Sequence, residues 1–192
     1  MPQEIWSAND AKKDEWIFAF AANWPDLVRR ASKVVTDDDV LKFNRPTWHY
    51  VDFPLFLNQA EEQHLAGSLH INLETEPPVG HDEPTMNVIQ AIKNSSRIVA
   101  DKSAPAADRA LHLAWLCHVV GDAHQPLHST ALYISKRFRA GDQGGTLLHI
   151  ANRRSVPSYW AGLVLSIRDH AAIRHAAPPG GRSTSVHKVG RG

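Results

Sequence analysis

Apolar residues recur at steps of three and four in several stretches of the chain, and this spacing predicts α-helices. The first stretch carries Trp16, Ile17, Phe20 and Ala21. We expect Pro25 to interrupt this helix, because proline lacks the N–H group that a helix interior needs. The acidic run at residues 36–39 is interpreted as a solvated turn or a helix cap.

Two further helices are predicted in the second half of the chain. One opens at Pro84 and turns inward a set of apolar residues, Met86, Val88, Ile89, Ile92, Ile98 and Val99. The longer one starts at Ser103 to Pro105 and runs to about Gly121, since proline is favoured in the first turn of a helix. One stripe of this helix consists of Leu111, Ala114, His118 and Asp122. An imidazole therefore stands where a core residue is expected, and a buried imidazole needs a partner for each ring nitrogen.

The segment before these helices is polar. Residues 58–82 contain two consecutive prolines and a glycine, and we expect a loop that exposes His64, His70 and His81. No stretch shows a convincing strand alternation, so we predict an all-α fold. We expect one mostly helical domain over residues 1–166. Residues 167–192, rich in proline, glycine, serine and basic residues, are expected to form a disordered basic tail.

Composition and charge narrow the possible functions. The chain has 192 residues and 43% hydrophobic content, which is enough for one core. Lys and Arg number 21 against 20 Asp and Glu, so a protein that binds nucleic acid by charge alone is not indicated. No apolar run reaches membrane-spanning length, and the first residues lack the apolar stretch of a secretory signal. The single Cys117 excludes an intrachain disulfide. Twelve histidines are the unusual count, and they make metal chemistry worth testing.

The run His118-Val-Val-Gly-Asp-Ala-His-Gln-Pro-Leu-His128 concentrates side chains that bind metals. His118 and Asp122 lie four residues apart, so on a helix they share one face. Pro126 breaks the chain after them and lets His128 fold back toward the same place. Imidazole and carboxylate are common zinc ligands. The alternative is that both histidines are core residues and that the aspartate is a helix cap. For any histidine of this chain taken singly, a core or structural role is the better interpretation.

Four motifs that occur together along the chain favour metal binding over the structural interpretation. LHLAWLCHVVGDAHQPLH, preceded by WPDLVR and WHYVD and followed by GDQGG, resembles the zinc-dependent single-strand nucleases of the S-one/P-one type. The matching stretch extends from Trp24 to Gly145. The resemblance implies a mostly helical domain with three zinc ions at the bottom of a cleft. It also implies hydrolysis of single-stranded DNA and RNA to 5′-phosphate products, with removal of 3′-phosphates as a further activity.

The resemblance assigns metal ligands position by position. It implies that Asp26, His49 and His118 bind zinc, that Asp122 bridges two zinc ions, and that His128 binds a further one. Two carboxylates and two imidazoles, from the first four of these residues, make a normal set of zinc ligands.

Substrate contacts follow from the resemblance in the same way. Arg29 matches an arginine that contacts phosphate, and a planar guanidinium suits a phosphate well. Asp52 matches the aspartate that orients or activates the attacking water. Tyr50 matches an aromatic residue of the base pocket, where stacking favours unpaired strands. Thr146 stands where the family has an asparagine that contacts phosphate.

The chain departs from the family toward both ends. The family's leading tryptophan and nearby histidine, which bind zinc, have no counterpart around Trp6. Two further family ligands, which share the zinc of His128, are replaced by Pro157 and Ala161 beside a matching Trp160. By this comparison one zinc site is complete and two are depleted. This pattern is the one expected if the sequence is a shortened or frame-disturbed form of a longer gene.

Three functions stay open on the sequence. The first is a zinc-dependent endonuclease with single-stranded nucleic acid as its substrate, no membrane association and no obligate protein partner. The second is the related zinc phospholipase C chemistry, which Arg29 and Tyr50 disfavour because they match the nuclease pattern. The third is a metal-binding relative that is catalytically silent. By resemblance, we expect a secreted or periplasmic protein.

Overall fold

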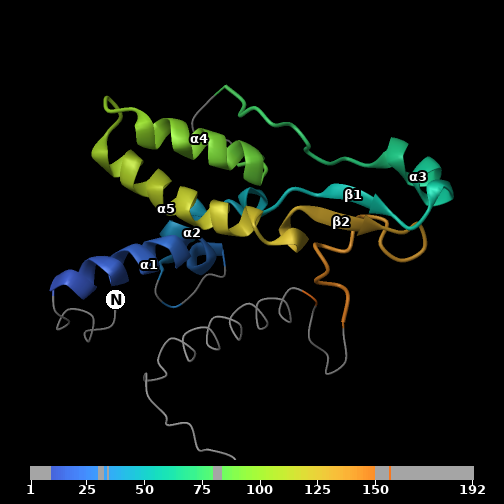
Figure 1. The fold of residues 1–192 in the computed structure, drawn as a ribbon, viewed down its shortest axis with the longest axis horizontal. Helices are drawn as coiled ribbons and strands as arrows, with labels where there is room; N and C mark the ends of the chain where they lie inside the picture. The colour runs from blue at the N-terminus through green and yellow to red at the C-terminus, as the bar shows by residue number, and fades with distance from the viewer. Residues whose placement is uncertain (1–9, 30–32, 34, 80–83, 150–155, 157–192) are drawn as a thin grey trace, which may run out of the picture. The chain divides into compact units, whose positions relative to one another are not determined.

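Five α-helices account for most of the regular structure in the described residues, and they confirm the predicted all-α class (Figure 1). The computed structural model describes residues 10–29, 33, 35–79, 84–149 and 156. The chain divides into two compact units, Met1–Leu148 and His149–Gly192, and every element named below belongs to the first. In chain order, with η for a short 3₁₀ helix, the elements are α1 (Asp10–Arg29), α2 (Asp37–Phe43), η2 (Pro46–His49), β1 (Phe53–Phe56), α3 (Gln59–Leu65), η3 (Ala66–Ser68), α4 (Val88–Ala100), α5 (Ala106–Ala123), η4 (Pro126–His128) and β2 (Thr130–Tyr133).

Helix α1 is continuous, so the predicted interruption at Pro25 is wrong. Proline in a helix interior removes one backbone hydrogen bond and displaces the carbonyl four residues earlier. Packing offsets this cost, because Pro25 and Val28 are both buried. The predicted apolar stripe of α1 is only partly covered: Trp16 is 55% exposed, Ile17 is 37% exposed, and Phe20 is half-buried.

Thr36 caps helix α2, which confirms the cap interpretation of the acidic run. The Thr36 hydroxyl accepts a hydrogen bond from the Asp39 amide at 3.1 Å, and the Asp39 carboxylate accepts one from the Thr36 amide at 3.0 Å. This reciprocal pair satisfies two amides that a helix start otherwise leaves without partners. The acidic run therefore serves the helix start.

The prediction of a loop over residues 58–82 is wrong in part, since this segment contains α3 and η3. Asn58 caps α3 by accepting a hydrogen bond from the Glu61 amide at 3.0 Å. That local capping signal was hidden by the polar composition of the segment. His64 and His70 are exposed, as predicted, and His81 lies outside the described residues.

Helix α4 begins at Val88 instead of Pro84, because Asn87 forms a capping box with Gln90 at this point. The Asn87 side chain also donates to two backbone carbonyls of the preceding extended segment, at Asn72 and Glu74. The predicted inner side of this helix is confirmed: Met86, Val88 and Ile98 are buried, and Ile89, Ile92 and Val99 are half-buried.

The main core lies where α4, α5 and η2 meet, and α5 runs between α4 and α1 (Figure 1). Trp48 of η2 packs edge-to-face on Trp115 of α5, with ring centroids 4.9 Å apart. The other buried members of this core are Val51, Met86, Val88, Ala91 and Val119. Aromatic packing of this kind adds roughly 0.5–1.5 kcal/mol beyond simple burial. It fixes η2, and with it His49, against the middle of α5.

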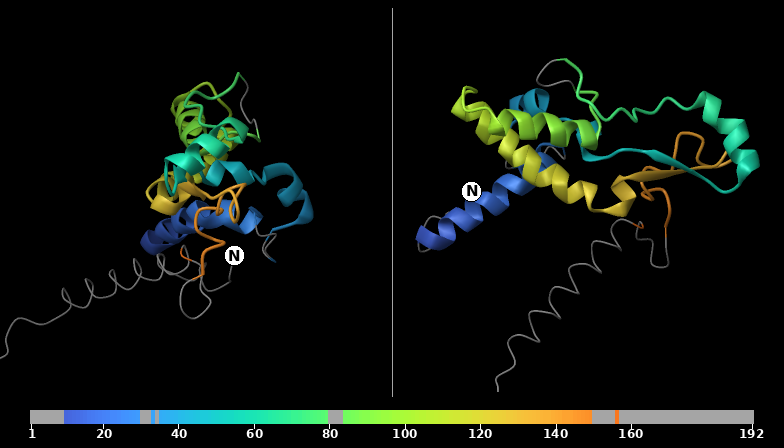
Figure 2. Two further views of the ribbon diagram at one scale, coloured as in Figure 1. Left: turned by 90° about the vertical axis from the view of Figure 1, so that its right-hand side faces the viewer. Right: turned by 45° about the horizontal axis from the view of Figure 1, so that its top comes forward.

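A two-stranded parallel ribbon of β1 and β2 was not predicted. Figure 2 shows it extending from the helices α4 and α5 toward α3. The register pairs Phe53 with Thr130 and Phe56 with Tyr133. Each strand has four residues, and β1 contains a proline, so no alternation long enough to recognise exists in the sequence. Ala131 and Tyr133 of β2 form a second small core with Leu65 of α3.

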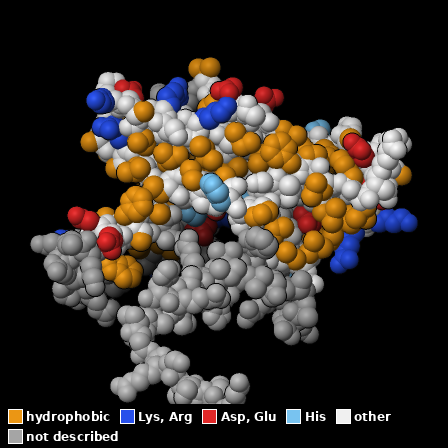
Figure 3. All heavy atoms as spheres, in the orientation of Figure 1, with side chains coloured by type: hydrophobic (Ala, Val, Ile, Leu, Met, Phe, Trp, Pro, Cys, Tyr) orange, Lys and Arg blue, Asp and Glu red, His pale blue; other side chains and the backbone are white. Residues whose placement is uncertain are grey.

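Several large hydrophobic side chains stay on the surface, and they are spread across the face shown in Figure 3. Within the described part of the chain, no helix is long and apolar enough to cross a membrane. The boundary predicted at residue 166 and the tail predicted after it lie outside the described residues.

Candidate metal centre and adjoining pocket

Helix α5 carries His118 and Asp122 on one face, as their spacing predicts. The Nε2 atom of His118 lies 3.2 Å from Oδ2 of Asp122, and the two side chains are 9% and 17% exposed. The end of α5 therefore holds an imidazole and a carboxylate in contact, both largely removed from water.

His49 reaches the same place from η2. Its Nδ1 atom lies 3.0 Å from Nε2 of His118 and 3.0 Å from Oδ2 of Asp122. The ring of Trp115 stands edge-on to both imidazoles, with centroids 5.5 Å from His49 and 6.4 Å from His118. Because Trp115 is buried, this indole restricts the rotation of both rings.

The contact made by the second ring nitrogen of His118, Nδ1, shows which nitrogen carries the hydrogen in the neutral ring. Nδ1 lies 2.8 Å from the carbonyl oxygen of Ala22 in α1, and a carbonyl oxygen only accepts hydrogen bonds, so Nδ1 carries the hydrogen. Neutral His118 then presents the lone pair of Nε2 to the cluster, and Nε2 donates to Asp122 only when the ring carries a second proton. Pro25 disturbs the regular hydrogen bonding of α1 in this turn, and the Ala22 carbonyl lies within it.

Asp26 adds a second carboxylate from α1. Its Oδ1 atom lies 3.9 Å from Nε2 of His118. Asp26, His49 and His118 each offer one ligand atom, and these three atoms lie within 4.8 Å of one another. With Asp122 beside both imidazoles, the structure brings together four of the five predicted ligands.

This donor set fits zinc. Zinc is bound tetrahedrally with nitrogen ligands at about 2.0–2.1 Å, so neighbouring ligand atoms stand roughly 3.3 Å apart. The separations found here are 3.0 Å between the imidazoles, 3.0 and 3.2 Å from these to Asp122, and 3.9 Å from His118 to Asp26. An imidazole that binds a metal commonly donates its other N–H to a carbonyl or a carboxylate, and His118 does so at Ala22.

Protons supply the positive charge that this cluster needs when no metal does. Burial acts to lower the pKa of His118, but the hydrogen bond with Asp122 and the charges of Asp122 and Asp26 raise it above its ordinary value. Burial acts to raise the pKa of Asp122, but hydrogen bonds with His118 and His49 outweigh burial and hold this pKa well below its usual range. A metal ion held by these ligands would therefore compete with the protons.

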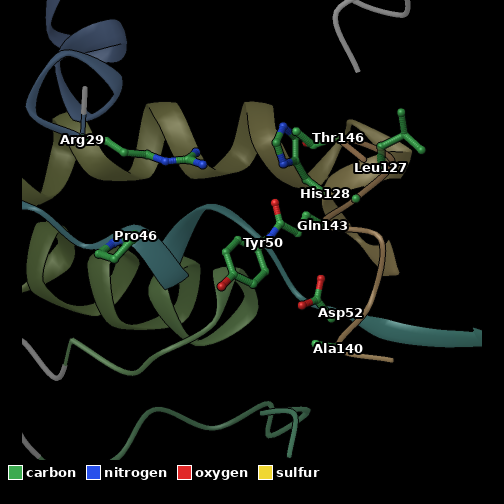
Figure 4. Close-up of a pocket in the computed structure, with 10 residues that line it drawn as sticks. Arg29, Pro46, Tyr50, Asp52, Leu127, His128, Ala140, Gln143 and Thr146 are labelled. Carbon is green, nitrogen blue, oxygen red and sulfur yellow. The ribbon is translucent and has the colours of Figure 1, made fainter. Parts of the chain in front are cut away.

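A pocket of about 420 Å³ adjoins this cluster (Figure 4). Three residues of its wall follow the ligands closely along the chain: Arg29 comes one helical turn after Asp26, Tyr50 follows His49, and His128 follows the end of α5. The lining residues are Arg29, Pro46, Tyr50, Asp52, Leu127, His128, Ala140, Gln143, Gly144 and Thr146. All four predicted substrate and catalytic residues thus line one pocket.

The unpredicted strand pair brings Asp52 and His128 together. The Val51 amide donates to the His128 carbonyl at 2.8 Å, and the parallel register starts with Phe53 opposite Thr130. The residues immediately before both strands therefore meet at one end of the ribbon, which is the end that faces the pocket.

Asp52 has an environment suited to a general base. Burial and the negative charge of Asp142 raise the pKa of the Asp52 carboxyl. Asp142 is buried and accepts a hydrogen bond from the Leu132 amide at 3.0 Å. Burial together with the nearby acidic groups also raises the pKa of Tyr133 to about 12. A carboxylate with a raised pKa is a stronger base, and it therefore accepts a proton from water more readily.

His128 lies in the pocket wall, apart from the three-residue ligand group. Burial lowers the pKa of its imidazole, and the negative charge of Asp122 only partly offsets this effect. The ring is therefore neutral at physiological pH, which is the form that binds metals. Among the residues that the structure describes, no histidine, cysteine or acid completes a three-ligand group with it. Pro157, Trp160 and Ala161 lie outside the described residues.

Sequence reasoning missed four contributors to this site. Trp115 precedes His118 by three residues, so helical spacing alone was a usable signal for it. Asp142 and Gln143 lie inside the GDQGG motif, to which no role was assigned residue by residue. The Ala22 contact uses a backbone carbonyl and leaves no trace in the sequence.

Comparison with protein families gives a match to the family described as S1/P1 Nuclease, over residues 3–159. This match includes all of the helices, strands, candidate ligands and pocket residues described above. No curated protein matches the chain.

Proposed function

The chain belongs to the S1/P1 nuclease family, and on this premise we propose that it is a zinc-dependent nuclease. Membership of the family indicates a phosphodiester hydrolase that acts on nucleic acid. The finer proposal is hydrolysis of single-stranded DNA and RNA to 5′-phosphate products, with removal of 3′-phosphates at the same site. One observation carries it: two carboxylates and two imidazoles converge on one point next to a pocket with an arginine and an aromatic ring.

We propose that Asp26, His49, His118 and Asp122 hold one zinc ion and that His128 contributes to a further one. Zinc, when bound, neutralises charge on the phosphate and lowers the pKa of water. The mutual approach of Asp26, His49 and His118, with Asp122 against both imidazoles, supports the first site. The second site lacks a recognised partner for His128 in the described residues.

The remaining wall residues take roles that match their chemistry. Arg29 binds the phosphate, since its guanidinium presents a fork of donors to two phosphate oxygens. Asp52 accepts a proton from the attacking water, and its raised pKa suits that task. Tyr50 stacks on an unpaired base, and the Thr146 hydroxyl donates to the phosphate. Relatives of this family are generally secreted, and we propose export for this protein as well.

The decisive experiment combines zinc content per chain with the release of acid-soluble nucleotides from single-stranded DNA. Asp52→Asn is expected to keep the zinc content and to lower release by roughly 10²–10⁴-fold, the usual loss when a general base is removed. Asp108→Asn, at an exposed position in the first turn of α5, is the matched control and should behave as the wild type.

Other outcomes identify the alternatives. One such outcome is a wild type that binds single-stranded DNA but releases no more nucleotides than His118→Ala does. This result would indicate a catalytically silent relative and overturn the proposal. Hydrolysis of phosphatidylcholine without release of nucleotides would indicate phospholipase C chemistry.

A further inference from the structure

Gln143 is the one residue other than glycine with a positive φ in the described part of the chain, at 55°. Its loop neighbours Gly141, Gly144 and Gly145 also have positive φ. Glycine adopts this region without steric cost, whereas a residue with a Cβ atom does not. The loop therefore keeps a glutamine side chain at a position where its backbone favours glycine.

Nothing in the loop itself accounts for that side chain. The Gln143 carbonyl accepts a hydrogen bond from the Thr146 amide at 3.2 Å, so the main chain closes the turn. The Gln143 carboxamide forms no hydrogen bond with any other residue that the structure describes. The residue is exposed, and it lines the pocket. Backbone strain of this kind is concentrated at active sites and ligand-binding sites, where the surrounding structure holds it in place.

The position of the carboxamide suggests its partner. Figure 4 shows Gln143 directed into the pocket, in that view between the side chains of Tyr50 and His128. Arg29 and His128 suit an anion, and Tyr50 offers an aromatic face. The carboxamide differs from these groups because it donates and accepts hydrogen bonds side by side. The edges of nucleobases present adjacent donors and acceptors, and an unpaired base that stacks on an aromatic ring leaves these edges open to side chains.

We propose that Gln143 is a base-binding residue, whose carboxamide hydrogen-bonds the edge of the nucleobase that stacks on Tyr50. This inference rests on the nuclease function proposed above and assigns the base, as distinct from the phosphate, to this side of the pocket. Arg29 would then hold the phosphate at the opposite wall.

Binding of small probes to the zinc-loaded protein tests this assignment. Calorimetry compares 5′-AMP and 5′-CMP with ribose 5-phosphate, which has the sugar and the phosphate but no base. Gln143→Gly is expected to weaken both mononucleotides about tenfold, the effect of losing a paired base contact, and to leave ribose 5-phosphate unchanged. The same variant should melt at a higher temperature than the wild type, because glycine relieves the positive φ. Gln59→Ala, at an exposed position of α3, is the control.

Two results overturn the proposal. Mononucleotide affinities of Gln143→Gly equal to those of Gln59→Ala would show that the carboxamide makes no contact with the base. An equal loss for ribose 5-phosphate would show that Gln143 serves the phosphate or the loop. Nucleotide release from single-stranded DNA by the wild type distinguishes the two proposals. If the wild type releases nucleotides, either result above overturns only the role of Gln143. If it releases none, both proposals fail.

Discussion

The site has a ligand side, formed by Asp26, His49, His118 and Asp122, and a pocket side, formed by the residues that line the pocket. Different kinds of structure carry the two sides. The ligand side is carried by helices and a buried 3₁₀ turn, and the core residue Trp115 packs beside its two imidazoles. The pocket side includes the loop 141–146, in which four residues have positive φ and Gln143 and Thr146 are exposed. Metal binding needs ligand atoms held within a few tenths of an ångström, which packed elements provide. Binding residues in proteins are disproportionately carried by loops, whose exposed side chains change without disturbing the core.

Removing a ligand is expected to give the largest effect and to be confined to the ligand side. His118→Ala should weaken zinc binding by more than about 100-fold, because losing a ligand costs more than losing one of its supporting contacts. Nucleotide release should fall to background in the same variant. Equilibrium dialysis with zinc measures the effect. His64→Ala, at an exposed histidine of α3, is the control, and equal zinc affinity in both variants would contradict the assignment.

A methyl group added to the loop is expected to damage the pocket side alone. A Cβ atom at Gly144, where φ is 60°, would stand 2.2 Å from the Leu127 carbonyl oxygen. Gly144→Ala should therefore lower the free energy of unfolding by about 1–3 kcal/mol and weaken mononucleotide binding, with zinc content unchanged. Urea unfolding and zinc analysis measure the two effects. Gly67→Ala, with open space around its Cβ position, is the control. A parallel loss of zinc in Gly144→Ala would show that the two sides are coupled.

The smallest expected effect is a shift in the pH dependence of activity when the charge of Asp142, which is hydrogen-bonded to strand β2, is removed. In the proposed function Asp52 acts as a carboxylate, so we expect activity to fall as the pH drops through its pKa. The charge of Asp142 helps to raise that pKa. Asp142→Asn removes the charge but keeps an oxygen for the Leu132 amide, so the acidic limb should move to lower pH, by at most about one unit. A pH–rate profile checks this, with Asp108→Asn as the reference. An unchanged limb, or a shift to higher pH, would remove Asp142 from this role.

Much of the ligand side was readable in the sequence because its signals are local. The spacing of His118 and Asp122 places both on one helix face whatever the rest of the chain does. The apolar period of residues 86–99 correctly indicated the inner side of α4, and the helix cap found at Thr36 is one of the two interpretations given for residues 36–39. The exposed His64 and His70 also followed from the lack of a ligand spacing around them.

The remaining features depend on contacts between distant segments. The meeting of His49 with Asp122 follows from the packing of Trp48 on Trp115, and hydrophobic spacing does not specify which distant partner a residue meets. The continuity of α1 through Pro25 depends on tertiary burial that outweighs an unfavourable local preference.

The sequence by itself determined the fold class, the position of the helix that carries His118 and Asp122, and the set of side chains that we propose to bind a metal, because these depend on helix geometry and on chemical type. Only the tertiary structure decided which nitrogen of His118 faces the cluster, how the β1–β2 register brings Asp52 to His128, and that Gln143 points into the pocket at a strained φ. Each of these rests on a backbone group or a long-range pairing, and the identity of a side chain carries no information about either.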